Sequence, residues 1–151
     1  MLLESARLGL LEIDEARIIR FPQGIPGFEQ YHDYVLLQPD PELPLSYLQC
    51  VNEGYVSFIV IDPFLILPSY EFELSDSVKK ELHLTDPADV SVLAIVTVLD
   101  DIRNATLNLK APLVINSRER IGKQVILHDS PYETKHPMFA RAHAGKSEAK
   151  R

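Results

Sequence analysis

The chain has 151 residues, a formal net charge of −7 and a single cysteine. This length allows one domain around one hydrophobic core and leaves little room for a second domain. One cysteine excludes an intramolecular disulfide, which is typical of proteins from a reducing compartment. No stretch approaches the roughly 20 apolar residues of a membrane-spanning helix, and the N-terminus lacks the pattern of a secretory signal. We therefore expect a soluble, cytoplasmic protein without a membrane partner.

The charge is distributed unevenly. Residues 135–151 carry five basic residues against Glu148, a net charge of +4, whereas residues 1–134 carry ten basic and 21 acidic residues, a net charge of −11. An acidic body repels nucleic-acid phosphates and favours a basic protein partner. Solubility alone also explains this charge.

Apolar and β-branched runs recur along the chain, separated by Pro, Gly, Asn and Asp. They predict nine strands, at residues 8–13, 17–21, 34–38, 46–51, 57–61, 90–99, 105–109, 113–116 and 121–128. The run at 90–99 is almost continuously apolar, which is typical of a central strand covered on both faces.

One short helix is predicted between a capping Ser75 and Asp86-Pro87. Nine short strands, one helix and 11 prolines predict an all-β fold, a single-domain antiparallel barrel-like or sandwich structure. We assign the β domain to residues 1–138. Residues 139–151, with no large apolar residue after Phe139, are predicted to form a disordered basic tail.

The first notable stretch is residues 21–29, Phe-Pro-Gln-Gly-Ile-Pro-Gly-Phe-Glu. Pro26 fixes φ for the second position of a turn, and Gly27 supplies the positive φ that a type II turn requires at the third. Phe21 and Phe28 flank the turn. The pattern predicts a rigid loop, which can also present a binding surface.

The second stretch, residues 62–74, combines aromatic residues, two prolines and acids. Asp62-Pro63 is typical of a turn after a strand, and the prolines argue against an ordinary central strand. Aromatic side chains held beside acids suit a protein-binding patch. Alternatively, the segment covers an open end of the barrel with its aromatic side chains inside.

The third stretch, residues 107–116 followed by 122–127, indicates two strands near a sheet edge, with Asn116 and Ser117 as turn residues. No pattern indicates catalysis. The five histidines lack metal-ligand spacing, no serine lies in a nucleophile elbow, and Cys50 lies in an apolar run. We expect a protein that is not an enzyme, with no cofactor and no metal site.

Together these stretches resemble the FliW family of flagellar assembly factors. The resemblance covers residues 6–138, in the family's order and spacing. It is carried by residues 21–29, by Asp62-Pro63-Phe64 with Tyr70-Glu71-Phe72, and by residues 108–116 with Gln124-Val125 and His136-Pro137. Ser69 departs from the acid that the family often has there, and the basic tail lies outside the pattern.

The resemblance implies a compact antiparallel β-barrel-like fold without a cofactor. It also implies two partners, the RNA-binding translational repressor CsrA and cytoplasmic flagellin. In the family, binding of CsrA relieves repression of the flagellin message, and flagellin sequesters the factor until it is exported. A CsrA-type protein binds RNA and should be basic, which suits the acidic body. We predict a contact surface of apolar anchors and acids: Asp62, Phe64, Tyr70, Glu71, Phe72 and Glu73.

The alternative is a small barrel that binds nucleic acid. Such a barrel needs a basic groove with aromatic platforms, whereas the positive charge here gathers in the tail, where Phe139 is the only aromatic residue. We therefore expect no direct nucleic-acid binding. A hydrolase or ligand-binding barrel is a third class, and no set of residues supports it.

Overall fold

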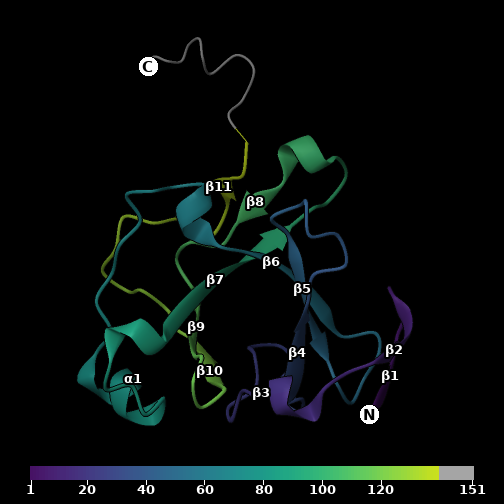
Figure 1. The fold of residues 1–151 in the computed structure, drawn as a ribbon. Coiled ribbons are helices and arrows are strands. Elements are labelled where there is room, and N and C mark those ends of the chain that lie inside the picture. The colour runs from purple at the N-terminus through teal and green to yellow at the C-terminus, as the bar shows by residue number, and fades with distance from the viewer. Residues whose placement is uncertain (140–151) are drawn as a thin grey trace.

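The computed structural model describes residues 1–139, so the predicted tail lies outside the described residues except for Phe139. Its main feature is a sheet of nine strands in the order β11-β8-β7-β6-β5-β4-β3-β10-β9. A further pairing of β7 with β9 joins the ends of a seven-stranded part into a closed barrel (Figure 1). The predicted all-β, barrel-like fold is therefore confirmed.

The elements follow one another with short connections. The strands are β1 (Leu2–Ser5), β2 (Gly9–Glu12), β3 (Ile19–Arg20), β4 (Asp33–Leu37), β5 (Ser46–Cys50), β6 (Ser57–Ile61), β7 (Val90–Thr97), β8 (Thr106–Leu107), β9 (Leu113–Asn116), β10 (Ile121–Gln124) and β11 (His136–Pro137). Within residues 1–139 the helices are the α-helix α1 (Asp76–Glu81) and the 3-10 turns η1 (Glu15–Arg17), η2 (Pro63–Leu65), η3 (Pro87–Asp89) and η4 (Ile102–Asn104).

Barrel closure depends on β7. Its residues 94–96 pair with β6, while on its other side residues 90–93 pair with β9 and residues 96–97 with β8. These pairings are antiparallel, and the parallel contact of Ile121 with Arg20 joins β10 to β3. The predicted central strand is thus confirmed, although it ends at Thr97 rather than Leu99.

The strand predictions were less accurate at the edges. Residues 8–13 contain only β2, which forms a separate hairpin with β1, and residues 17–21 contain only the two residues of β3. The strand predicted to reach residue 128 ends at Gln124. Val125 N–H still donates to the Pro112 carbonyl at 2.9 Å, but Pro112 has no N–H to return the bond. β11 was not predicted.

Apolar side chains form three clusters. One fills the barrel with alternate residues of its strands, among them Tyr34, Leu48, Val60 and Leu113. A second cluster lies on the outer side of β7 and β9, where the segment from η2 to α1 packs against them. The third lies under the β1–β2 hairpin. Along β7, Leu93 and Ile95 pack on the first cluster and alternate residues pack on the second, so both of its faces are covered as predicted.

The first motif forms the predicted rigid loop. Phe28 N–H donates to the Ile25 carbonyl at 2.7 Å, and Gly27 has a φ of 90°. Phe21 and Ile25 are buried in the barrel, whereas Phe28 is partly exposed. The loop is therefore anchored by its apolar side chains at one end of the barrel.

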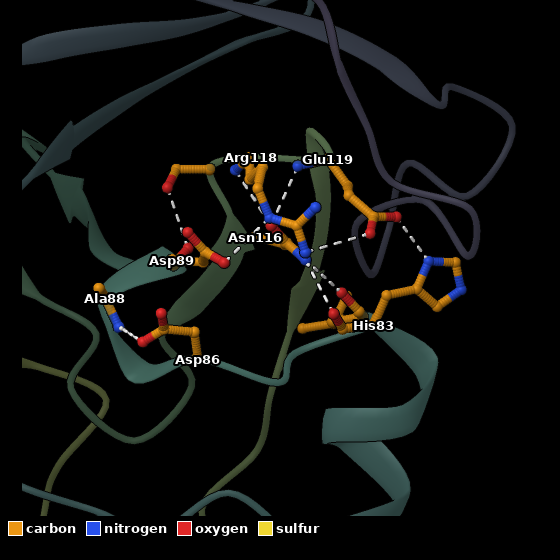
Figure 2. Close-up of polar contacts among 9 residues, drawn as sticks. His83, Asp86, Ala88, Asp89, Asn116, Arg118 and Glu119 are labelled. Carbon is orange, nitrogen blue, oxygen red and sulfur yellow. Dashed lines mark hydrogen bonds and ion pairs between the residues drawn. The ribbon is translucent and has the colours of Figure 1, made fainter.

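Asn116 ties α1 to the barrel. Its buried amide nitrogen donates to the carbonyls of Leu82 at 2.8 Å and His83 at 3.2 Å, and its oxygen accepts from the N–H groups of Arg118 and Glu119, both at 3.0 Å. Figure 2 shows this amide between the end of the helix and the β9–β10 turn, with further polar contacts around it. These are the hydrogen bond between His83 Nδ1 and Glu119 Oε1 at 2.8 Å and the ion pair of Arg118 with Asp89 at 3.1 Å.

Two tyrosines are buried in different ways. Tyr34 is 0% exposed inside the barrel, and within residues 1–139 its hydroxyl has no hydrogen-bond partner. Tyr70 is 2% exposed, and its hydroxyl donates to the Leu109 carbonyl at 2.7 Å. Burial raises the pKa of both phenols. Only the second hydroxyl therefore contributes a hydrogen bond to the fold.

This difference predicts opposite effects of the same substitution. Tyr70→Phe should lower the free energy of unfolding by about 1–3 kcal/mol, because the buried Leu109 carbonyl loses its donor. Tyr34→Phe should leave stability unchanged or raise it, because it removes a hydroxyl that is buried without a partner. Urea unfolding of both variants measures the difference. An equal loss in the two variants would contradict the hydrogen-bond assignment.

Two glycines of the first motif provide a second test. An added Cβ at Gly24, where φ is 70°, would lie 2.6 Å from Glu29 Cα, whereas at Gly27 it would meet nothing within 4 Å. Gly27→Ala should therefore lower the free energy of unfolding by about 1–2 kcal/mol, because the only penalty is the left-handed backbone conformation of a residue with a Cβ. Gly24→Ala should lower it clearly more, since the backbone of Glu29 must move to make room for the added Cβ. The urea midpoints of the two variants give this order, and a reversed order would refute it.

Candidate functional site

The predicted contact segment begins with a capped turn. Asp62 Oδ1 accepts a hydrogen bond from the Phe64 N–H at 2.9 Å, and Pro63 occupies the first position of η2. Asp62 therefore sets the direction in which the chain leaves β6, while its carboxylate stays exposed. Leu65, next to Phe64 in the turn, is also exposed.

Tyr70 holds the segment against the barrel. Its ring lies 5.7 Å from that of Phe64, 5.4 Å from that of Phe72 and 4.6 Å from that of Tyr132, measured between ring centroids. Pairs at these distances stabilise one another beyond their burial. Tyr132 was not predicted, because it lies in an irregular stretch 62 residues away with no pattern of its own.

The residues of the segment differ in burial. Tyr70 is buried in the second apolar cluster, which lies on the outer side of β7 and β9 and not at an open end of the barrel. Phe72 is half-buried and Phe64 is 41% exposed. The acids, Asp62, Glu71 and Glu73, are all exposed.

A groove with a volume of about 870 Å³ runs beside this segment. Glu71, Phe72 and Glu73 form one wall together with the start of α1, and residues 123–132 form the other. The structure thus brings three of the six predicted residues to the groove. Asp62, Phe64 and Tyr70 do not line it. In Figure 1, α1 and β10, from which the two walls extend, lie at the same end of the molecule.

Polar contacts fix both ends of the groove. At one end, Gln23 of the first motif donates to Glu81 of α1 at 2.7 Å, and Lys123 Nζ lies 3.0 Å from both carboxylate oxygens of Glu81. At the other end, Glu71 N–H donates to the Tyr132 hydroxyl at 2.9 Å. These contacts join segments from three separate parts of the sequence and so fix the distance between the two walls.

The groove is acidic and partly apolar. Glu71, Glu73 and Asp129 are exposed along it, and no ion pair involves them within residues 1–139. The positive charge of Lys123 is matched by Glu81. Phe72, Ile126 and Tyr132 supply apolar surface between the acids. Such a surface suits a partner with basic and apolar side chains.

Reactive groups do not gather here or elsewhere in residues 1–139. In that part of the chain no three His, Cys, Asp or Glu side chains come close enough together to hold a metal ion. Cys50 is buried, and desolvation raises the pKa of its thiol, which disfavours the reactive thiolate. No helix of the described chain is long and apolar enough to cross a membrane.

Comparisons with known proteins agree with the motifs. The FliW protein family model matches residues 2–138. The flagellar assembly factor FliW of Alkaliphilus metalliredigens (strain QYMF) is 44% identical over 137 residues, which cover 90% of this chain and 85% of that protein. The one of Geobacillus kaustophilus (strain HTA426) is 47% identical over 131 residues, which cover 87% and 90%.

A solved structure shares the fold as well as the sequence. The crystal structure of a flagellar assembly factor FliW has a TM-score of 0.88 to this chain at 42% sequence identity, and the match covers 94% of this chain and 99% of that one. Since the family model, the sequences and the fold all match over most of the chain, the protein belongs to the FliW family.

Proposed function

We propose that this chain is a flagellar assembly factor that works as a protein-binding adaptor. It binds a CsrA-type translational repressor and relieves repression of the flagellin message. It also binds cytoplasmic flagellin, so that flagellin synthesis follows flagellum assembly. The observation that carries this proposal is the match to curated flagellar assembly factors over most of the chain, at 44% and 47% identity.

The charge of the molecule supports a basic partner. Residues 1–134 have a net charge of −11. A protein that binds RNA phosphates carries positive charge, so the two molecules attract each other at long range. The same charge disfavours direct contact between this domain and RNA.

The predicted contact residues form two connected groups. Glu71, Phe72 and Glu73 line the groove, and Asp62 and Phe64 lie on the adjoining turn. Tyr70 lies beneath both groups and connects them, because its ring packs against the rings of Phe64 and Phe72. A partner on this surface would meet exposed carboxylates next to half-exposed aromatic rings, the combination found where polar rim and apolar core of an interface meet.

The acids of the groove provide the test. The double variant Glu71→Lys with Glu73→Lys should weaken binding of the CsrA-type regulator from the same organism at least about tenfold, or about 1.4 kcal/mol. Affinity of the original chain should fall with added salt, and this dependence should be smaller in the variant. Calorimetry at two salt concentrations measures both effects.

A matched control separates local contacts from total charge. Glu15→Lys with Glu42→Lys makes the same change in net charge at two exposed positions that do not line the groove. The control should keep most of the affinity. Equal losses in both double variants would reject the surface, while no complex at all with the original chain would reject the function.

A further inference from the structure

The chain after β10 has one unpaired backbone edge. Val125 N–H donates to the Pro112 carbonyl at 2.9 Å and Leu127 N–H to the Lys110 carbonyl at 2.8 Å, which continues the β9–β10 register. Successive N–H groups of an extended chain point to opposite sides. The N–H and C=O of Ile126 therefore point away from residues 110–112, and within residues 1–139 they have no hydrogen-bond partner.

This edge borders the groove. Five successive residues, 124–128, line it. Because side chains alternate between the two faces of an extended chain, a groove that meets five in succession follows the backbone edge rather than one face. On the opposite wall, Glu71, Phe72 and Glu73 alternate between exposed, half-buried and exposed positions, as an extended segment does. The groove, with a volume of about 870 Å³, is thus bordered by two extended segments.

The edge lacks the devices that normally block strand addition. Residues 124–128 contain no proline and no lysine. Ile126 in the middle of the edge is 51% exposed. Exposed strand edges of this kind bind extended peptides through main-chain hydrogen bonds, and the flanking side chains select the sequence.

The charges of the walls define the peptide that fits. Glu71, Glu73 and Asp129 are exposed acids on the two sides of the groove, and Lys123, the one Lys or Arg among residues 1–139 that line it, is paired with Glu81 at 3.0 Å. An extended peptide with Lys or Arg at alternate positions would place its cations beside these acids. Apolar residues between them would contact Phe72 and Ile126.

We propose that residues 124–128 pair with an extended, basic segment of a protein partner, which lies in the groove as an additional strand. The N–H and C=O of Ile126 and the N–H of His128, which follows Leu127 at the start of a turn, bond to the segment, and Glu71, Glu73 and Asp129 select its basic residues. The proposal rests on the adaptor function proposed above and specifies the mode of binding.

Amide hydrogen exchange of the full chain tests this without any substitution. In the free protein, the amides of Val125 and Leu127 should exchange slowly and those of Ile126 and His128 faster. Saturation with the CsrA-type regulator should slow exchange at Ile126 and His128 at least about tenfold, because each gains a main-chain hydrogen bond. Unchanged exchange at both amides in a saturated complex would overturn the proposal and leave the adaptor function intact.

A pair of variants tests the same bond by affinity. Ile126→Pro removes the N–H that faces the groove, and Ile126→Ala keeps it; both replace the Ile side chain by a smaller apolar one. The proline variant should bind the regulator about tenfold more weakly than the alanine variant, the effect of one lost hydrogen bond. Equal affinities of two folded variants would overturn the proposal.

Two other results are informative. Protection of Ile126 and His128 in the free full chain that disappears when residues 139–151 are removed would show that the chain's own basic end occupies the edge, which overturns the proposal. No complex between the full chain and the regulator would reject the adaptor function and the groove with it.

Discussion

The hydrogen bond from the Tyr70 hydroxyl to the Leu109 carbonyl, 2.7 Å long, holds an irregular segment against a regular barrel. Residues 62–75 form no β-ladder with the sheet, so their position depends on side chains. The other supports are the Asp62 cap and the hydroxyl of Tyr132, which accepts the Glu71 N–H. Together with the bond from Tyr70, these contacts fix the distance between the wall that carries Glu71 and Glu73 and residues 123–132.

This arrangement explains why aromatic residues and acids alternate in the segment. The side chains of Tyr70 and Phe72 pack in the second apolar cluster. Those of Glu71 and Glu73, the residues that follow each of them, are exposed. Burial of the rings stabilises an extended conformation that Pro68, two residues before Tyr70, already restricts. The carboxylates are thereby held in a row at little cost in conformational entropy on binding, which is what a preorganised interface requires.

Local chemistry was readable from the sequence, and contacts between distant segments were not. Ser75 caps α1 by accepting the Val78 N–H, and Gly27 has the positive φ that its turn needs, both as the residue types predict. The groove depends instead on residues 123–132, and the bond from the Glu71 N–H to the Tyr132 hydroxyl joins positions about sixty apart in the sequence. Such a short irregular stretch has no periodicity, so only the fold shows which side of it is open.

The backbone edge at residues 124–128 also suggests how the two proposed partners could exclude one another. The N–H and C=O groups of residues 124–128 that point into the groove can bond to one added strand at a time. Two partners that both use this edge exclude one another through occupancy alone, with no change in the barrel. Partners on separate surfaces would instead need a coupling free energy carried through the barrel. A shared edge needs no such coupling, so it is the simpler physical basis for the proposed competition.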